Sequence, residues 1–251
     1  MRHRPRERPG LALFCLAAAG GGAAPFRGWH AHLPEEIDVC AVRLPGRENR
    51  IYEEPVAEMP RLVQALADGI ADELRALPFA IYGQCTGALV GFELARELRR
   101  RGLPAPVHLL AADQDAPSRT VPEAEPGATL SQDELVERVR RFGATDQIFL
   151  GDPELFAAIE PALRADFALG DGYRYSEEPP LETPITVLAR REAELAPALT
   201  DWRAETTGTF TLRVLPAEKL LDAEAWPAIV AAVAAELRGP ALERAAAVAG
   251  G

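Results

Sequence analysis

The chain has 251 residues, of which 48% are hydrophobic and 26% charged, so its composition excludes wholesale disorder and a fibrous fold. Acidic residues outnumber basic ones by 38 to 27, which gives a net charge of -11. Because phosphate contacts need a basic surface, this charge argues against a nucleic-acid partner.

The N-terminal region admits two interpretations. Residues 1–24 combine a basic stretch, a short apolar run and small residues, as a secretory signal does. Alternatively, residues 1–10 form a flexible basic tail, and Leu11–Leu16 form a buried strand that leads into the glycines at 20–22. The second interpretation fits the rest of the chain, where strands and helices alternate. The chain has no run of about 18 apolar residues, so we expect no transmembrane helix and no membrane partner.

Short apolar runs bounded by turn residues recur along the chain and predict buried strands. Beyond the first strand they are Ile37–Val42, Phe79–Tyr82, Val107–Ala112, Ile185–Leu188 and Phe210–Leu215. Apolar residues at helical spacing lie between several of these runs, in residues 62–74 and 89–98, and after the last run, in residues 229–237. Continuous apolar strands that alternate with helices predict an α/β fold with a mostly parallel sheet flanked by helices.

Residues 131–175 contain two helical segments with no strand between them. In an α/β domain such an insertion commonly forms a cap over the carboxyl edge of the sheet, so we expect a helical lid here. Residues 239–251 have the composition of a flexible tail. We therefore predict one domain over residues 11–238 that includes the lid.

The strand that begins at Phe79 runs into Gly83-Gln84-Cys85-Thr86-Gly87, and a helix follows at once. This is the G-x-S-x-G pattern of a nucleophile elbow, with cysteine in the serine position. The glycines permit a sharp strand-to-helix turn, and the helix N-terminus favours a thiolate. The backbone N–H of Thr86 would face the developing oxyanion. The alternative interpretation is that Cys85 is a buried structural cysteine, which is common for this residue type.

At this point the chain resembles a known family, the type II thioesterases, which are stand-alone α/β-hydrolases of polyketide and nonribosomal-peptide assembly lines. The segments that carry the resemblance are Leu13-Phe14-Cys15 with Ala19-Gly20-Gly21 and Phe26-Arg27-Gly28-Trp29, Leu44-Pro45-Gly46-Arg47-Glu48-Asn49-Arg50, Phe92-Glu93-Leu94-Ala95-Arg96, Arg164-Ala165-Asp166-Phe167 and Tyr173-Arg174-Tyr175. The resemblance implies an α/β-hydrolase fold and a second oxyanion donor at the backbone N–H near Ala19. It also implies an acyl thioester substrate carried on the phosphopantetheine of an acyl or peptidyl carrier protein, with no cofactor on this chain.

The chain departs from the family at all three positions of its Ser-His-Asp triad. Cys85 replaces the serine, and Lys219, which is the only lysine, stands at the histidine position. The usual acid position aligns with Ala193, where the neighbouring Glu192 or Glu194 could substitute. A second candidate acid is Asp113, because related type I thioesterase domains place their aspartate after the corresponding strand. The competing interpretation of Asp113 and Asp115 is a pair of solvated, turn-forming aspartates.

The substitutions change the chemistry that the site can perform. A cysteine needs a base less than a serine does, and Lys219 could act as the partner of the thiolate or as a base, oriented by Asp113. An acyl group on Cys85 remains a thioester, and hydrolysis lacks the usual histidine. The leading hypothesis is therefore transfer of the acyl group to a non-water nucleophile, by acyl transfer, condensation or cyclisation. The alternatives are a conventional editing thioesterase and a catalytically dead protein that binds carrier proteins.

Two further features bear on location and partners. The chain has three cysteines, an odd number without the spacing of metal ligands, so we expect no disulfide framework, no metal site and a cytoplasmic location. Arg96, Arg99, Arg100 and Arg101 form a basic cluster at the end of the helix that follows the elbow. This cluster is either a local docking patch for an acidic carrier protein or a solvated helix end with cations favoured by the helix dipole.

Overall fold

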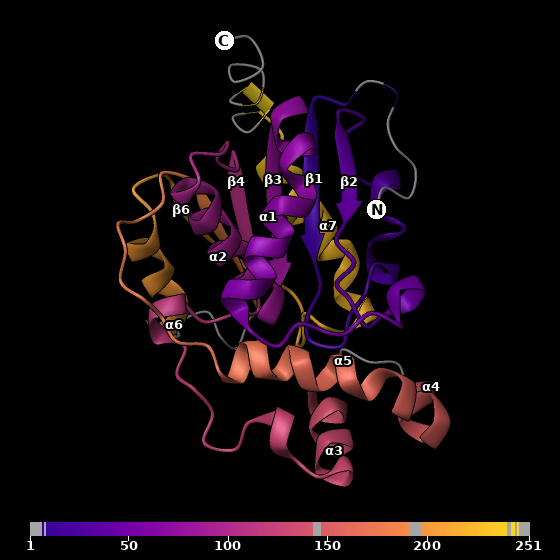
Figure 1. Cartoon of the computed structure of the whole chain (residues 1–251). Helices are drawn as coiled ribbons and strands as arrows, with labels where there is room; N and C mark the ends of the chain where they lie inside the picture. The colour runs from indigo at the N-terminus through magenta and orange to yellow at the C-terminus, as the bar shows by residue number, and fades with distance from the viewer. Residues whose placement is uncertain are drawn as a thin grey trace.

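The computed structural model describes residues 7, 9–142, 147–190, 197–239, 242–243 and 245. Within these residues one parallel sheet has the strand order β2-β1-β3-β4-β5-β6 (Figure 1). The strands are β1 (Leu11–Leu16), β2 (Ile37–Ala41), β3 (Phe79–Gln84), β4 (His108–Ala112), β5 (Ile185–Arg190) and β6 (Phe210–Leu215). All six coincide with predicted runs to within two residues at each end, so the prediction of a parallel α/β sheet is confirmed.

The side chains of each central strand alternate between two apolar cores, one on each face of the sheet. In β1, Leu11, Leu13 and Cys15 join the core under the C-terminal helix, whereas Ala12, Phe14 and Leu16 join the core on the other face. Every residue of β1 is buried. This burial on both faces explains why the sequence shows continuous apolar runs rather than alternation with polar residues.

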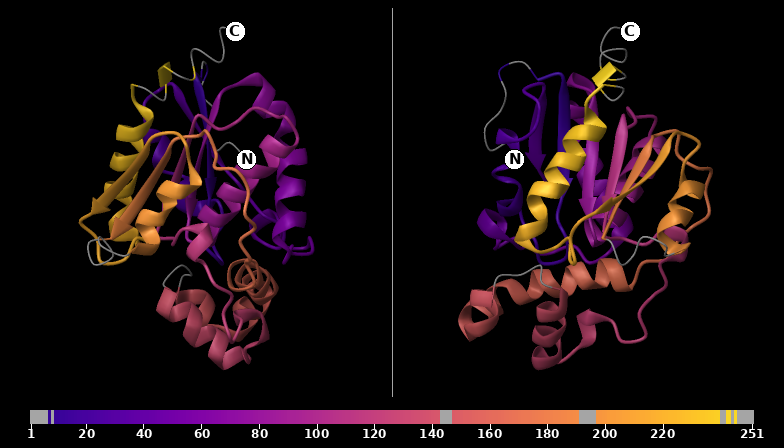
Figure 2. Two further views of the ribbon diagram at one scale, coloured as in Figure 1. Left: turned by 90° about the vertical axis from the view of Figure 1, so that its left-hand side faces the viewer. Right: turned by 180° about the vertical axis from the view of Figure 1, so that it is seen from behind.

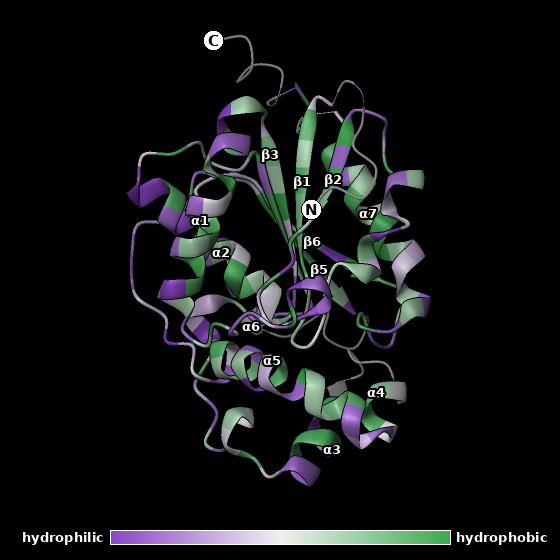
Figure 3. Ribbon diagram, turned by 45° about the vertical axis from the view of Figure 1, so that its right-hand side comes forward, coloured by the Kyte–Doolittle hydropathy of each residue, from purple (hydrophilic) through white to green (hydrophobic). Residues whose placement is uncertain are grey.

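Helices cover both faces of the sheet. Helices α1 (Met59–Ala76) and α2 (Thr86–Arg100) cover one face, and α7 (Trp226–Leu237) covers the other (Figures 1 and 2). The central strand β1 is largely hydrophobic, in keeping with its burial between the two helical layers (Figure 3). Shorter helical elements are η1 (Ala24–Phe26), η2 (Trp29–Ala31), η3 (Glu48–Arg50), η4 (Pro117–Arg119), η5 (Gly127–Thr129), α6 (Pro197–Thr200), η7 (Asp201–Glu205) and η8 (Ala223–Ala225).

A separate helical layer lies across the edge of the sheet where the strands end (Figures 1 and 2). It contains α3 (Gln132–Phe142), α4 (Gln147–Gly151) and α5 (Pro153–Asp171), so the prediction of two helical segments is wrong and three are described. The break before α5 has a local cause, since the Asp152 side chain caps the helix at the backbone N–H groups of Glu154 and Leu155, and Pro153 begins it. The layer has its own apolar core, which includes Leu135, Val139, Leu150, Phe156, Leu163 and Phe167.

The two predicted tails fall mainly on residues outside the described ranges, so their flexibility stays a prediction. Among the described residues, every helix is too short or too polar to cross a lipid bilayer.

Candidate active site

The turn between β3 and α2 is a sharp elbow centred on Cys85. Cys85 has φ 51° and ψ −126°, and its N–H donates to the carbonyl oxygen of Ala112 at 2.8 Å. A Cβ added at Gly83 would lie 2.3 Å from the carbonyl oxygen of Gly87. A Cβ at Gly87 would lie 2.5 Å from the carbonyl oxygens of Leu16 and Ala17. Both glycines are therefore required by close backbone approach, as the G-x-C-x-G pattern predicts.

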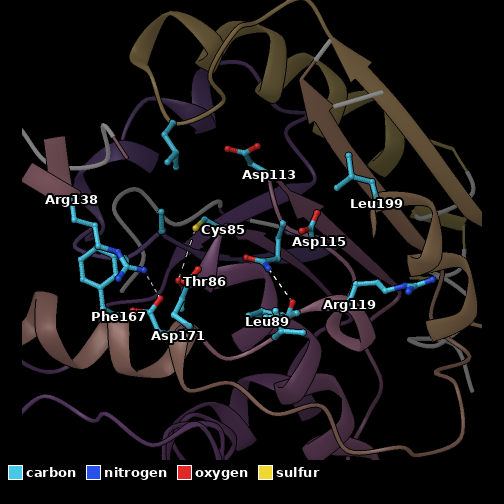
Figure 4. A pocket seen from close by; sticks show the side chains of 18 of the residues that line it. Cys85, Thr86, Leu89, Asp113, Asp115, Arg119, Arg138, Phe167, Asp171 and Leu199 are labelled. Carbon is cyan, nitrogen blue, oxygen red and sulfur yellow. Dashed lines mark hydrogen bonds and ion pairs between the residues drawn. The ribbon is translucent and has the colours of Figure 1, made fainter. Parts of the chain in front are cut away.

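Cys85 lies in a pocket of about 440 Å³ between the carboxyl ends of the strands and the helical layer. The first turn of α2 contributes Thr86 and Leu89, the loop after β4 contributes Asp113 and Asp115, and the turn after β1 contributes Ala19. Other lining residues include Arg138, Val139, Phe167, Gly170 and Asp171 from α3 and α5, and Leu199 from α6. Figure 4 shows Thr86, Asp113 and Asp171 arranged around Cys85.

The surroundings of Cys85 favour a neutral thiol. Burial is the largest effect and raises the pKa of Cys85; hydrogen bonds from the backbone and hydroxyl of Thr86 lower it, and the carboxylates of Asp113 and Asp171 raise it again. The Thr86 hydroxyl lies 3.9 Å from the sulfur. The amide at the N-terminus of α2 favours the thiolate, as expected, but burial and nearby negative charge act against it and raise the pKa of Cys85 on balance.

Asp113 is brought into the same pocket as Cys85. It follows β4 directly with φ 52°, and its N–H donates to the carbonyl oxygen of Leu188 at 3.1 Å. Burial raises the pKa of its carboxyl group, Arg190 lowers it with Nε 3.8 Å from Oδ1, and Asp115 raises it. A carboxylate with a raised pKa holds a proton more readily than an ordinary aspartate, which suits a group that exchanges a proton with the thiol.

The structure does not bring Lys219 into the pocket. Its side chain is exposed on the turn after β6 and is absent from the described residues that line the pocket, whereas Leu221 does line it. The neighbouring Leu220 is buried, and its carbonyl oxygen accepts a 2.6 Å hydrogen bond from the Gln84 side chain. The predicted role of Lys219 as a thiolate partner or base stays a prediction.

The predicted acid substitutes, Glu192 and Glu194, lie outside the described residues. The two predicted oxyanion donors both lie on the pocket wall. Thr86 is the first residue of α2, where backbone N–H groups have no partner within the helix. The N–H of Ala19 has no acceptor within the part of the chain that the structure describes. Both residues thus lie on the wall of the pocket that contains Cys85, and their role as oxyanion donors stays a prediction.

The three histidines that the structure describes do not line the pocket. His108 is buried in the sheet, with Nε2 2.9 Å from the Thr186 hydroxyl. His30 and His32 lie after the first turn and, like His108, are absent from the described pocket lining, and His3 is outside the described residues. The sequence holds four histidines in all, so none follows position 108.

Sequence reasoning missed Asp171 and Arg138. Asp171 ends α5; one of its oxygens accepts from the Gly127 N–H at 2.6 Å and the other from Arg138 Nη2 at 2.8 Å. Burial raises the pKa of the Asp171 carboxyl group although Gly127 and Arg138 lower it. The motif at 164–167 pointed to this helix, but helical periodicity does not say which polar residue faces the pocket.

The basic cluster at the end of α2 is neutralised by carboxylates of the same chain. Arg96 is 2% exposed and pairs with Glu93 and Glu178, so the expectation of a solvated helix end is wrong for this residue. Arg100 and Arg101 are exposed, in keeping with that expectation. Arg99 and Arg100 also bind Glu178, whereas Arg101 binds Glu97 and Asp68. These ion pairs leave little unbalanced positive charge for an acidic partner.

Known proteins match this chain over nearly its whole length. The family model described as "Thioesterase domain" matches residues 12–237. The gramicidin S biosynthesis protein GrsT of Aneurinibacillus migulanus is 37% identical over 211 residues, which are 83% of this chain and 81% of that protein. The solved structure of RedJ, a thioesterase of the prodiginine pathway in Streptomyces coelicolor, has 33% identity and a TM-score of 0.83, covering 91% of this chain and 87% of RedJ.

The type II thioesterase BorB from the borrelidin biosynthetic cluster has 30% identity and a TM-score of 0.82, with 95% of each chain covered. The sheet, the flanking helices and the elbow therefore form an α/β-hydrolase fold, as expected. On the combined evidence of the family model, the relatives and the fold, the chain belongs to the type II thioesterase family.

Proposed function

We propose that this thioesterase takes an acyl group from a carrier-protein thioester onto Cys85 and passes it to a nucleophile other than water. The observation that carries the proposal is a cysteine at the strained elbow, in a pocket whose described wall bears carboxylates and no imidazole. In the family this chain resembles, a histidine activates the water that releases the acyl group. Without that histidine, water attacks the acyl-enzyme slowly, so the acyl-enzyme persists until a stronger nucleophile than water reacts with it.

The first step is exchange of one thioester for another. The Cys85 sulfur attacks the acyl carbonyl carbon while Asp113 accepts the thiol proton, since the raised pKa of Cys85 leaves little thiolate. The backbone N–H groups of Ala19 and Thr86 hold the oxyanion of the tetrahedral intermediate. The bond from carbon to the carrier sulfur then breaks, and Asp113 returns the proton to the departing pantetheine thiol.

The second step releases the acyl group from Cys85. An acceptor thiol or amine, or a carbanion formed when Asp113 removes a C–H proton from the acceptor, attacks the carbonyl carbon. The bond to Cys85 breaks, and the proton that the acceptor has given to Asp113 passes to the sulfur. Because acyl-Cys85 is itself a thioester, the activation of the acyl group is kept until this step. Acyl transfer, condensation and cyclisation differ only in which nucleophile enters the pocket.

Hydrolysis is the second candidate function, and two observations favour it. The chain belongs to a family of thioesterases, and the Asp113 carboxylate could activate water instead of an acceptor. This chain would then be an editing enzyme that removes stalled acyl groups. In both candidates Cys85 and Asp113 have the same roles in the first step, so the fate of the acyl-enzyme distinguishes them.

The proposed partner is an acyl or peptidyl carrier protein, and no cofactor is required on this chain. Support comes from the names of the relatives, which place GrsT in gramicidin S biosynthesis, RedJ in the prodiginine pathway and BorB in the borrelidin cluster. Products of this kind are built on carrier-bound thioesters. The proposal extends this setting to the chain, as an enzyme that acts beside a natural-product assembly line.

The test is the intact mass of the protein followed over time after exposure to acyl-carrier-protein thioesters. We expect a lasting acyl adduct in the wild-type protein and none in the Cys85→Ala variant. Peptide mapping should place the adduct on Cys85, because Cys15 and Cys40 are buried in the two cores. Adding candidate thiols or amines should then discharge the adduct faster than buffer alone.

Other outcomes separate the alternatives. Rapid release of free acid without a lasting adduct would establish the editing thioesterase. Failure of a broad panel of acyl thioesters to give adduct or acid, with a thiol that still reacts with iodoacetamide, would favour a carrier-binding protein without catalysis.

A further inference from the structure

The turn after β1, which carries the proposed oxyanion donor Ala19, is held by three charged side chains from distant parts of the chain. Asp166 of α5 accepts a 2.7 Å hydrogen bond from the N–H of Gly20. Arg47 donates to the carbonyl oxygen of Gly21 at 2.8 Å. Glu48 accepts from the N–H groups of Ala23 and Ala24 at 3.0 and 3.1 Å.

Arg47 and Asp166 also bind each other in a bidentate ion pair. Arg47 Nη1 and Nη2 lie 2.8 Å from Oδ2 and Oδ1 of Asp166, and the two side chains are 10% and 4% exposed. The same Asp166 oxygen therefore receives both the Gly20 amide and the Arg47 guanidinium. Both residues belong to motifs that mark the family resemblance, but nothing in the reaction described above uses them.

The helix that supplies Asp166 also forms the wall of the pocket. Phe167, Gly170 and Asp171 follow Asp166 within α5 and line the pocket beside Cys85. A Cβ at Gly170 would lie 3.0 Å from the Thr86 hydroxyl, so α5 packs directly on the elbow. One helix thus contacts the acyl pocket, the elbow and the oxyanion turn at once.

We propose that Asp166 and Arg47 are positioning residues that set the oxyanion turn and couple its geometry to the seating of α5. This inference rests on the proposed acylation of Cys85. Asp166 occupies the Gly20 N–H and leaves the neighbouring Ala19 N–H without an acceptor among the described residues. The ion pair therefore determines which amide of the turn is available to the oxyanion.

The sequence of the turn explains why it needs this support. Residues 20–22 are three consecutive glycines, and Gly20 has φ 76°. Glycine has the largest conformational freedom of any residue, so this segment has little intrinsic preference for one geometry. The three charged side chains hold the turn in one geometry, and movement of α5 away from the sheet would remove the contribution of Asp166.

The test compares two reactions of the same thiol. Acylation by the carrier-protein thioester forms an oxyanion, whereas alkylation by iodoacetamide displaces iodide and forms none. We expect Asp166→Ala to reduce the maximal acylation rate by about 10²-fold, the loss typical of one oxyanion donor, with little change in the thioester concentration at half-maximal rate. Alkylation should stay within about twofold of wild type.

A graded series sharpens the test and guards against misfolding. Asp166→Asn keeps one acceptor oxygen and loses the charge, so its acylation rate should lie between those of wild type and Asp166→Ala. Glu160→Gln is the matched control, because it breaks the Glu160–Arg164 ion pair on the same helix without touching the oxyanion turn. Its acylation rate should equal that of wild type. Amide hydrogen exchange of residues 19–24 should become faster in both Asp166 variants.

Two results would overturn the inference. The first is that the Asp166→Asn and Asp166→Ala variants are acylated at the wild-type rate. The second is that acylation and alkylation fall in parallel, which would indicate a structural role only. A wild-type protein that is alkylated but never acylated contradicts the proposed function instead. In that case, unchanged exchange in residues 19–24 of the Asp166 variants would show that the ion pair does not hold the turn, and faster exchange would show that it does.

Discussion

Two turns at the carboxyl edge of the sheet, the elbow after β3 and the turn after β6, differ in how far their sequence determines their function. At the elbow, close backbone approach at Gly83 and Gly87 forces the geometry, and Cys85 necessarily faces the pocket. The turn after β6 has no such constraint, and Lys219 is exposed on it. A motif enforced by backbone contacts therefore places its side chain reliably, whereas a position identified only by alignment does not.

The largest expected effect comes from breaking the elbow. Gly83→Ala puts a methyl group 2.3 Å from the carbonyl oxygen of Gly87, so β3 and α2 must separate. We expect a loss of about 3 kcal/mol in the free energy of unfolding, or a fall of about 6–12 °C in Tm. The matched control is Gly69→Ala in α1, where nothing lies within 4 Å and the change should stabilise the protein by up to about 1 kcal/mol. Calorimetry gives the Tm of each variant, and equal Tm values for Gly83→Ala and Gly69→Ala would contradict the prediction.

The next effect concerns Asp113, whose two roles at the thiol have opposite signs. Its negative charge helps to hold the pKa of Cys85 up, so Asp113→Asn should lower that pKa and speed alkylation by iodoacetamide at pH 8 several-fold. The same substitution removes the proposed proton acceptor, so acylation by a thioester should fall by about 10²-fold. Asp72→Asn, whose side chain is fully exposed on α1, is the control and should change neither rate. A fall in both rates for Asp113→Asn would remove Asp113 from the proposed mechanism.

A smaller effect tests the link between the two turns. The buried Gln84 side chain donates a hydrogen bond to the Leu220 carbonyl oxygen. This hydrogen bond joins the turn after β6 to the elbow. Gln84→Leu leaves that carbonyl oxygen without its donor and should cost about 1–3 kcal/mol of stability. Gln64→Leu, at an exposed position of α1, should be close to neutral. If hydrogen exchange in residues 216–222 is unchanged by Gln84→Leu, the two turns are independent.

The parts of the molecule that were predictable share a physical cause. The strands and main helices could be predicted because the spacing of apolar residues within each segment decides which side chains are buried. In β1, for example, alternate residues pack into the two cores on either side of the sheet. The helical layer was less predictable, since the capping of α5 by Asp152 divides it into more helices than periodicity indicated. Pocket residues such as Asp171 and Arg138 depend on how that layer docks, which sequence spacing does not determine.

The direction in which the pKa of Cys85 is shifted could not be predicted from the sequence either. The sequence placed a helix N-terminus behind Cys85, which favours a thiolate, but the balance also includes burial and two carboxylates from other elements. The ion pair of Arg47 and Asp166 joins residues 119 positions apart, and neither motif alone indicated the other. Long-range electrostatics of this kind becomes visible only when the elements are assembled.

The smallest expected effect is at Lys219. Because its ammonium is exposed and outside the described pocket lining, Lys219→Gln should change the free energy of unfolding by less than about 0.5 kcal/mol. Acylation, alkylation and their pH profiles should stay within about twofold of wild type. A large loss of acylation that Lys219→Arg restores would instead show that the β6 turn brings a cation to Cys85 when substrate binds. In that event the alignment of Lys219 with the family histidine would indicate a function that the geometry of the free protein does not show. Both turns would then contribute a side chain to the reaction, and the β6 turn would do so only after substrate binds.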